Sequence, residues 1–365
     1  TGELKFDSPE VKKAIETWST IWFNPAYVYG GTAGIVSTYF GDAPAPMFEQ
    51  PPKCWLHKQG NFITGFFPET AKAGVDYSFF YLPGLDPQYG KPFLVAGDIM
   101  TMFNDRPEVR ALMEYFTTPQ SASGWLQNGG ALAAHMTATP EMYGVDLERG
   151  IAALVSQATS FRFDGSDLMP GEVGAGSFWT GMTDYVSGAA DLDTVLKEIY
   201  ATWPKGTTPV AEPAAGFAVM PGGELEKALT GAYKGTTVTV DGPFTNPDDV
   251  RFAESMKAFQ DATGITVKYI GDKEFEARIS IAVDAGNPPD IADFPQPGKA
   301  ETYSRQGHIV DPTSWISEDW LKQQYNQSWL DMAMIEGPDG NKMVGGVWHR
   351  FNGKSLGWYP KDDFE

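Results

Sequence analysis

The residues that could carry out chemistry most directly lie at 353–357, where GKSLG fits the Gly-x-Ser-x-Gly pattern of a serine nucleophile. That pattern requires a strand, a sharp turn and then a helix, so that the serine hydroxyl is exposed. Trp358, Tyr359 and Pro360 follow here and do not open a helix, which favours a chance match. The Gly-Lys-Ser run is not a phosphate-binding loop either, because the first glycine of that motif would fall at Trp348.

Carboxylate and metal chemistry are no better supported. Asp248 with Asp249, and Asp362 with Asp363, could be imagined as the carboxylate pair of a glycosidase. Such carboxylates must flank a glycosidic bond from opposite sides, which sequence neighbours seldom do, so we interpret both pairs as charges at helix starts. The lone cysteine and the four histidines lack metal-ligand spacing. We therefore expect no catalytic residue, no metal and no cofactor.

Composition limits the partners. A chain of 365 residues can bury a large core and is expected to form two lobes. Its 27 basic and 47 acidic residues give a net charge of −20, which disfavours nucleic acids and anionic membrane surfaces. No apolar run approaches the roughly 20 residues that span a bilayer. The 23 Phe, 15 Tyr and 11 Trp exceed what such a core needs, so some are expected to face a ligand.

Strand and helix signals alternate most clearly in the last third of the chain. They predict a strand at 236–240, a helix from Asp248 that Gly264 stops, a strand at 265–269, and another that ends at Asp293. This alternation is typical of an α/β protein with parallel strands and helices on both faces of the sheet. Such sheets bind ligands at the carboxyl ends of their strands.

Helices are also predicted in the first part of the chain. Ser8 can cap one that starts at Pro9. Its apolar side chains recur at helical spacing and predict a packed amphipathic helix: Val11, Ile15, Trp18 and Trp22. Further helices are expected at 105–116 and around 191–203. The stretch 205–223 is rich in Gly, Pro, Ala and Thr and is interpreted as a linker.

Six short phrases occur together: GNPPDI at 286–291, KSLGWY at 354–359, FDSPE at 6–10, KPFLVAGD at 91–98, NDRPEV at 104–109 and SFW at 177–179. Jointly they resemble the extracytoplasmic solute-binding proteins of ABC sugar importers, in the branch of maltose-binding and α-glucoside-binding proteins. The resemblance implies a periplasmic-binding-protein fold, in which two α/β lobes joined by a hinge hold solute in a cleft. It also implies a noncatalytic, extracytoplasmic receptor, a monomer whose partners are a sugar and the permease subunits.

The order of these phrases differs from the family's. Its amino-terminal opening resembles 235–298, behind about 230 residues that resemble its carboxy-terminal part, so we expect a circular permutant. The first lobe would be 97–142 with 235–345, the second 1–95 with 143–204; 205–234 would link the original termini and 346–365 would cross toward the second lobe. Family members continue past the region like 361–365 into a helix, a strand and a helix before the part that resembles Thr1. One segment of the second lobe is therefore expected to be missing.

The resemblance also implies ligand contacts. Sugar sites combine stacked aromatic rings with planar hydrogen-bonding groups. Trp179 occupies the family position of an aromatic residue that stacks on a pyranose ring, although a Trp at a helix start can also fill a core. Phe244 and Phe294 follow strands at the expected cleft, with loop packing as the alternative. Trp55 is placed there by the same positional logic, with less support.

Polar contacts are expected beside the same turns. Gln296, Asn352, Arg350 and Gln50 are the amide and guanidinium candidates, and Arg350 could equally form a structural salt bridge. Asp98 ends an apolar strand and would be costly to bury without a partner, so a bond to a sugar hydroxyl is implied.

Four more polar or aromatic residues are weaker candidates. Trp348 and His349 precede the crossover-like strand at 355–359, and at least one side chain of 348–352 should face the cleft. A lone histidine is more often a satisfied core or surface residue. Asp241 and Lys53 follow the positional logic of Trp55.

Three functions remain open. A carbohydrate receptor for an ABC importer, binding a glucose-containing mono- or oligosaccharide, predicts ligand-dependent closure without turnover. A secreted glycoside hydrolase predicts that an oligosaccharide is shortened. An engineered, permuted ligand-sensing module built from such a receptor would place new termini near the cleft. Because no leader precedes Thr1, the sequence is that of a cytoplasmic protein or a mature exported chain, and the resemblance implies the second.

Overall fold

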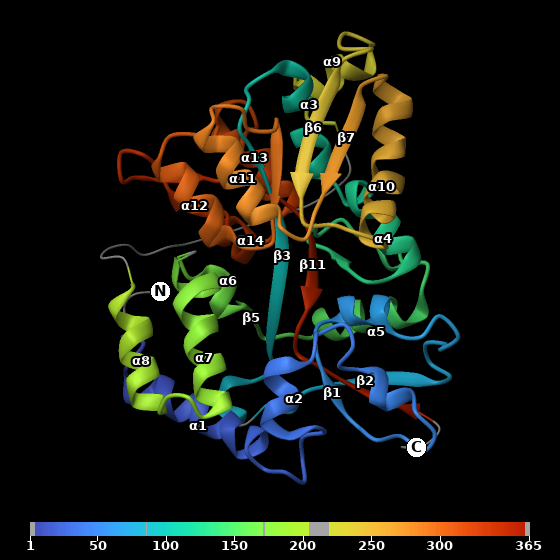
Figure 1. The fold of residues 1–365 in the computed structure, drawn as a ribbon. Coiled ribbons are helices and arrows are strands. Elements are labelled where there is room, and N and C mark those ends of the chain that lie inside the picture. The colour runs from blue at the N-terminus through green and yellow to red at the C-terminus, as the bar shows by residue number, and fades with distance from the viewer. Residues whose placement is uncertain (1–3, 85, 171, 204–218, 362–365) are drawn as a thin grey trace.

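The computed structural model describes residues 4–84, 86–170, 172–203 and 219–361 (Figure 1). These residues form a mixed α/β fold. Its strands are β1 (His57–Lys58), β2 (Tyr77–Tyr81), β3 (Pro92–Met102), β4 (Leu132–Ala133), β5 (Ser160–Phe163), β6 (Thr237–Gly242), β7 (Thr266–Gly271), β8 (Ile291–Phe294), β9 (Met334–Glu336), β10 (Lys342–Val344), β11 (Val347–Gly353) and β12 (Leu356–Pro360).

Helices surround the strands. The α-helices are α1 (Pro9–Trp22), α2 (Gly31–Ser37), α3 (Pro107–Phe116), α4 (Ser123–Asn128), α5 (Asp146–Val155), α6 (Gly165–Leu168), α7 (Phe178–Ser187), α8 (Leu192–Ala201), α9 (Glu224–Leu229), α10 (Asp248–Thr263), α11 (Phe275–Asp284), α12 (Pro297–Arg305), α13 (Glu318–Gln324) and α14 (Gln327–Met332). Short helical turns are η1 (Ala45–Phe48), η2 (Asn61–Phe66), η3 (Pro87–Tyr89), η4 (Pro119–Ala122), η5 (Pro140–Met142), η6 (Glu172–Ser177) and η7 (Pro312–Ser314). No helix in the described ranges is long and apolar enough to cross a membrane.

The larger sheet runs in the order β4-β11-β3-β8-β6-β7, and β5 pairs with the first half of β3. β6 pairs in parallel with β7 and β8, as the alternation of strands and helices predicted. The sheet as a whole is mixed, because β3 runs antiparallel to β8 and β11. β3 enters this sheet from the lower part of the molecule, whereas β11 runs in the opposite direction and leads down into the lower part (Figure 1).

The fold has an upper and a lower part in the view of Figure 1. The upper part contains β6, β7 and β8 with helices α3, α4 and α9 to α14 (Figure 1). The lower part contains α1, α2, α7, α8 and a small antiparallel sheet in the order β1-β12-β2. β3 is the long strand that joins the parts, and β11 continues through Lys354 and Ser355 into β12 of the small sheet (Figure 1).

The predicted helix ends agree with the structure. Ser8 accepts a hydrogen bond from the Val11 N–H at the start of α1, and Gly264 ends α10 with a left-handed φ of 69°. Residues 205–218 of the predicted linker 205–223 lie outside the described residues. The prediction that α1 is a packed amphipathic helix is confirmed only in part: Val11 and Ile15 pack, half-buried, against a small hydrophobic cluster, whereas Trp18 is 43% exposed.

Two hydrophobic clusters hold the described fold together. The larger one is centred on the upper sheet, where Val238, Val240 and Ile291 are fully buried, and it extends into the lower part through Ile63 and Trp358. The smaller cluster packs α7 and α8 with η6 around six residues: Phe6, Val173, Leu192, Val195, Leu196 and Ile199. The apolar face of α1 reaches only the border of this smaller cluster.

A buried polar chain crosses from α5 to the junction of the two parts. Glu148 is 1% exposed and accepts hydrogen bonds from the Gly130 N–H (2.7 Å) and Asn61 Nδ2 (3.4 Å). Asn61 Oδ1 in turn accepts from the Gly353 N–H at the end of β11 (2.8 Å). Burial raises the pKa of Glu148 to about 7, because the ionised carboxylate is poorly solvated there.

This raised pKa has a consequence for stability. The folded protein binds the Glu148 proton more tightly than the unfolded chain, in which this carboxyl has its ordinary pKa of 4.5. The contribution of this proton to the free energy of unfolding is therefore lost as the pH rises from about 4.5 to about 7. Glu148→Gln should reduce the fall in unfolding free energy between pH 5 and pH 8 by about 2–3 kcal/mol. Urea denaturation at the two pH values measures this. The exposed Glu10→Gln is the control, and an equal pH dependence in both variants would contradict the assignment.

Candidate ligand-binding site

A buried charge cluster lies where β6 and β8 end, beside the paired strands β3 and β11. Arg350 on β11 is 5% exposed, and its register partner on β3 is Asp98, which is 4% exposed. Arg350 Nε lies 3.0 Å from Asp98 Oδ2, and Arg350 Nη2 lies 3.2 Å from Asp248 Oδ2 at the start of α10. Asp293, near the end of β8, is fully buried beside them. We call Arg350, Asp98, Asp248 and Asp293 the charge cluster.

Aromatic rings enclose the guanidinium of Arg350. Its Cζ lies 4.4 Å from the ring centre of Phe244 and 4.6 Å from that of Trp125, both within cation–π range. Trp125 Nε1 also donates to Asp248 Oδ1 at 2.8 Å. The Tyr269 hydroxyl accepts from the Phe244 N–H (3.0 Å) and donates to Asp293 Oδ2 (3.5 Å). The rings therefore fix the orientation of the cation and shield it from water.

Burial and neighbouring charges shift the pKa values of the cluster. Burial works against the charge of Arg350, but Asp98, Asp248 and Asp293 outweigh it and raise the pKa of Arg350. Burial, reinforced by the nearby Asp98 charge, raises the pKa of Asp293 well above its usual range, although Arg350 opposes the shift. Burial also raises the pKa of Asp98, although Arg350 opposes the shift.

Polar atoms without partners surround the cluster. Arg350 Nη1, Asp293 Oδ1 and Asn352 Oδ1 are buried and make no hydrogen bond to the described protein. Asn352 lies two residues after Arg350 on β11 and is 8% exposed. Buried groups of this kind are costly unless a ligand or water satisfies them. They supply both donors and acceptors, which is the chemistry that a hydroxyl-rich solute needs.

The two parts of the molecule meet directly below this region. Lys354, which follows β11, places its Nζ 2.6 Å from Asp164 Oδ2 and 3.1 Å from Asp167 Oδ2 of α6. Burial raises the pKa of Asp167 to about 6, while the carboxylates overcome the burial of Lys354 and raise its pKa. This ion-pair triad ties the crossover to the lower part.

A second contact brings α12 against the chain that follows α6. A Cβ on Gly298 would lie 2.0 Å from the Met169 carbonyl oxygen, so only glycine allows this approach. Gln296 immediately precedes α12 as its N-cap residue. From Met169 the chain leads through η6 into α7, where Trp179 is the second residue. The chain that leads to Trp179 thus meets the start of α12, which Gln296 precedes, at a junction between the parts.

Trp179 is the most exposed of the predicted aromatic contacts. It lies in the first turn of α7, and 69% of its surface is accessible. The alternative that it fills a core does not hold, because so exposed an indole contributes little to packing. A large apolar ring held at the start of a helix is suited to stacking on a ligand.

Three predicted contacts lie in the core instead. Phe294 is 0% exposed and packs against Phe275 and Tyr303. Trp348 is 1% exposed, and its Nε1 donates to the Trp329 carbonyl (2.6 Å). His349 is fully buried, its Nε2 lies 2.6 Å from the Ser121 carbonyl, and burial lowers its pKa to about 3. Their positions favour packing over ligand contact.

Other predicted contacts lie apart from the charge cluster. Asp241 on β6 is 5% exposed and forms an ion pair with Arg278. Lys53 pairs with Glu49 on the surface of the lower part, and Trp55 is 46% exposed there. The structure therefore brings Asp98, Arg350, Asn352 and Phe244 together, and it does not bring Lys53 or Asp241 to them.

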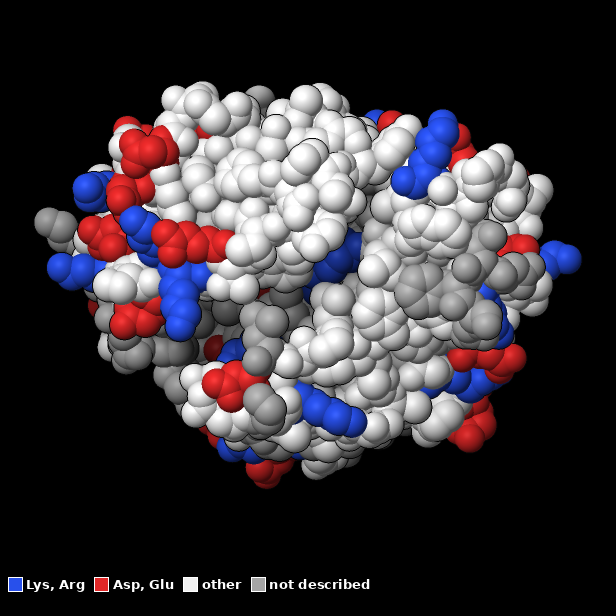
Figure 2. All heavy atoms as spheres, turned by 90° about the horizontal axis from the view of Figure 1, so that it is seen from below, with Lys and Arg blue, Asp and Glu red and all other residues white. Residues whose placement is uncertain are grey.

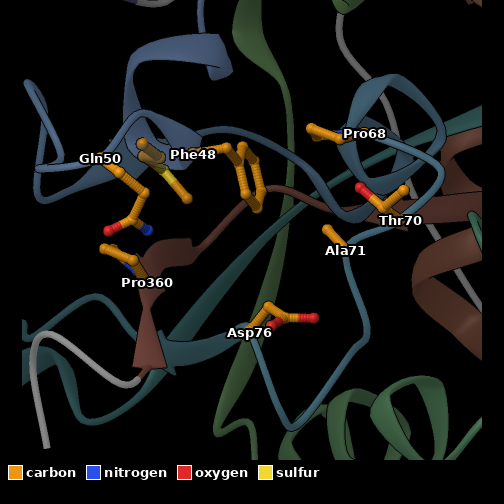
Figure 3. Close-up of a pocket in the computed structure, with 8 residues that line it drawn as sticks. Phe48, Gln50, Pro68, Thr70, Ala71, Asp76 and Pro360 are labelled. Carbon is orange, nitrogen blue, oxygen red and sulfur yellow. The ribbon is translucent and has the colours of Figure 1, made fainter.

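Gln50 lines a separate cavity of about 260 Å³ in the lower part (Figure 3). Phe48, Thr70 and Asp76 face the same space, beside Pro360 at the end of β12 (Figure 3). The cavity lies at the far end of β12 from the charge cluster, because β12 begins just after Lys354 and ends at Pro360. Gln50 is thus separated from the other predicted polar contacts.

Sequence reasoning missed part of the cluster. Asp248 was interpreted only as a helix-start charge; it does start α10, but it also binds Arg350 and Trp125. Trp125 and Tyr269 carried no local signal, because the chain brings them to Arg350 from 225 and 81 positions away. Asp293 could have been found, since an acidic residue inside an apolar strand end is costly to bury.

The serine motif at 353–357 has strands on both sides. Gly353 ends β11 and Leu356 begins β12, so no helix follows Ser355. The Ser355 hydroxyl accepts from the Leu94 N–H (2.8 Å), which ties β3 to the crossover. The prediction of a chance match to the nucleophile pattern is confirmed by this geometry.

Comparison with known proteins supports the resemblance seen in the sequence. No protein-family model matches the chain. Over 206 residues, 56% of this chain and 48% of the relative, it is 41% identical to the osmoprotective compounds-binding protein GgtB of Synechocystis sp.. Over 204 residues, 55% of this chain and 44% of the relative, it is 40% identical to the alpha-glucosides-binding periplasmic protein AglE of Rhizobium meliloti. The chain spans about half the length of the curated relatives it matches.

The mixed α/β fold is that of a periplasmic binding protein, with strands that cross between two parts. The matched portion of the chain is homologous to solute-binding proteins, and the relatives support the α-glucoside branch that the six phrases indicated.

The charge cluster makes a sharp prediction for stability. Arg350→Met should lower the free energy of unfolding by about 3–5 kcal/mol, because it leaves Asp98 and Asp248 without their buried cation. Adding Asp98→Asn should restore part of the loss. Arg305→Met is the matched control: its side chain is 32% exposed and pairs with Glu301, so the change should cost at most about 1 kcal/mol. Equal losses for both arginines in urea denaturation would show that the cluster contributes no more than a surface pair.

Proposed function

We propose that this chain is a noncatalytic carbohydrate receptor of the ABC-importer type, which closes around a glucose-containing mono- or oligosaccharide. The observation that carries the proposal is about 40% identity over more than 200 residues to proteins named for binding α-glucosides and osmoprotective compounds. On this proposal the protein works outside the cytoplasm and delivers its sugar to permease subunits.

The geometry supports a sugar as the ligand. Trp179 offers an exposed ring for the apolar C–H face of a pyranose. Asn352, Arg350 and Asp293 hold unpaired polar atoms that could bind hydroxyl groups. The buried Oδ1 of Asp293 has no partner in the described protein and offers an acceptor for a hydroxyl group. Gln296, at the start of α12, adds an amide at the junction.

Closure would use the crossing strands as a hinge. β3 and the β11–β12 connection join the upper and lower parts, and the predicted lobes are 97–142 with 235–345 and 1–95 with 143–204. A solute that contacts Trp179 on one side and the β11 side chains on the other binds the closed state better than the open one. It therefore shifts the population toward closure. The permuted order of the lobes is part of this proposal.

Removing the Trp179 ring should weaken binding without unfolding the protein. Trp179→Ala is expected to raise the dissociation constant for an α-linked disaccharide at least tenfold, since ring stacking is lost, and to leave the melting temperature nearly unchanged because Trp179 is 69% exposed. Calorimetric titration with maltose, trehalose, sucrose, glucose and a polyol tests this and identifies the preferred class.

Tyr89→Ala is the matched control for that titration. Tyr89 is 67% exposed in η3, away from the junction, so its removal should leave the affinity unchanged. Equal affinities for wild-type protein and Trp179→Ala would reject the stacking role. Shortened sugars in the mixture after incubation would reject the noncatalytic receptor in favour of a hydrolase.

A further inference from the structure

Charged groups inside the fold are more informative than those on its surface. Seen from below, the molecule shows charged side chains gathered toward two ends and a broad surface of other residues between them (Figure 2). The charge cluster around Arg350, by contrast, is largely buried, and Tyr269 lies beside it without being one of its members. Tyr269 belongs to β7, the edge strand of the larger sheet, which pairs with β6.

The Tyr269 hydroxyl connects two residues of the proposed site. It accepts a hydrogen bond from the Phe244 N–H (3.0 Å) in the loop after β6, and it donates a longer one to Asp293 Oδ2 (3.5 Å) on β8. An N–H can only donate, so the first bond leaves the Tyr269 proton free for another acceptor. Burial and the charge of Asp293 raise the pKa of Tyr269 well above its usual value, so the hydroxyl keeps this proton at neutral pH. One hydroxyl thus joins the backbone of a loop to a carboxyl group on another strand.

Asp293 keeps one oxygen for a ligand. Its Oδ1 is buried and has no hydrogen-bond partner among the described residues, while its Oδ2 faces Tyr269. A buried acceptor of this kind lowers stability unless a ligand or a water molecule supplies a donor. A solute hydroxyl can donate to Oδ1, whereas a group without a polar hydrogen cannot. The orientation of this carboxyl group therefore affects which solutes fit.

Two glycines make room for this arrangement. A Cβ on Gly242 would lie 2.3 Å from the Tyr269 hydroxyl oxygen and 2.8 Å from the Asp293 Cβ. A Cβ on Gly271 would lie 1.9 Å from the Phe244 carbonyl oxygen. Both distances are too short for any side chain, so glycine is needed at each position. The loop after β6 can therefore lie directly against β7.

The ring of Tyr269 and its hydroxyl can be tested separately. The ring stacks on Phe244 with centres 5.6 Å apart and 21° between the planes, and it lies 4.4 Å from the Phe252 ring. Tyr269 also borders a surface groove of about 320 Å³, which Thr245 and Gln260 line as well. A phenylalanine keeps these ring contacts, opens no sealed cavity and removes only the hydroxyl. Tyr269→Phe is therefore expected to fold.

We propose that Tyr269 is a positioning residue of the sugar site, whose hydroxyl orients Asp293 so that Oδ1 accepts a hydrogen bond from one sugar hydroxyl. The same hydroxyl holds the loop that carries Phe244, whose ring centre lies 4.4 Å from Arg350 Cζ. The inference rests on the proposed function and deepens it by naming one acceptor for the solute. Tyr269 acts through these neighbours and does not itself contact the solute.

Calorimetric titration of Tyr269→Phe tests the inference, with glucose, maltose and 2-, 3-, 4- and 6-deoxyglucose as probes. The variant should bind glucose and maltose about five- to tenfold more weakly, which is the contribution of one hydrogen bond. One deoxyglucose lacks the hydroxyl that donates to Asp293, and for this analogue the two proteins should agree within about twofold. Such a cycle isolates an interaction that the side chain and the ligand group share, whereas general damage to the fold weakens every analogue equally.

Amide hydrogen exchange gives a readout that needs no ligand. In Tyr269→Phe the Phe244 N–H loses its acceptor and should exchange about tenfold faster, while the paired N–H groups of β6 and β7 keep their rates. Tyr303→Phe is the matched control. Tyr303 is 4% exposed and its hydroxyl lies 2.8 Å from Ser280 Oγ, so this variant also loses a buried hydroxyl but should keep all affinities.

Three results would overturn the inference. They are an unchanged exchange rate of the Phe244 N–H, equal affinities of Tyr269→Phe and wild type for glucose and maltose, or the same loss for glucose and all four deoxyglucoses. If the wild-type protein binds no sugar at all, the proposed function fails, and the exchange rate of the Phe244 N–H still decides whether Tyr269 positions the loop. Melting temperatures confirm that both variants are folded.

Discussion

The buried ion pairs of Arg350 determine how the centre of this protein is packed. Arg350 is 5% exposed, and its ion pairs with Asp98 and Asp248 compensate for its removal from water. Because Asp98 is opposite Arg350 in the β3–β11 register, a slip of one strand by one residue would place the two charges on opposite faces of the sheet. The same pairing anchors the start of α10 through Asp248. Register, helix position and site polarity thus follow from one interaction.

A second group of ion pairs lies at Lys354, four residues after Arg350 and directly after β11. Lys354 binds Asp164 and Asp167 in the lower part, while Arg350 binds only groups of the upper part. A hinge motion at these strands can therefore leave the Arg350 pairing intact and change the Lys354 contacts, which are less deeply buried. The close backbone approach at Gly298 belongs to the same junction. The proposed closure would act on these two contacts first.

The sequence predicted what depends on neighbouring residues. Ser8 as a cap, Gly264 as a helix stop and the parallel unit of β6, α10 and β7 all rest on short-range signals, and the structure has them. Contacts between distant segments were harder to predict. Asp98 and Arg350 were both singled out as ligand contacts, yet their mutual ion pair spans 252 positions, and nothing local indicates it. Antiparallel crossing strands were missed for the same reason.

The spacing of apolar residues along a helix predicts which face is apolar, but it does not predict how much of that face is buried. The spacing of Val11, Ile15, Trp18 and Trp22 is that of a helix packed on a core, but only Val11 and Ile15 pack against the smaller cluster, and Trp18 is 43% exposed. The excess of aromatic residues was expected to face a ligand, and Trp179 fits that expectation. Most of the exposed rings, however, gather at the lower end, in a stretch without charge inside a strongly acidic chain. Their spacing along the sequence gives no signal of this exposure, because the burial of a ring depends on what the rest of the fold places over it.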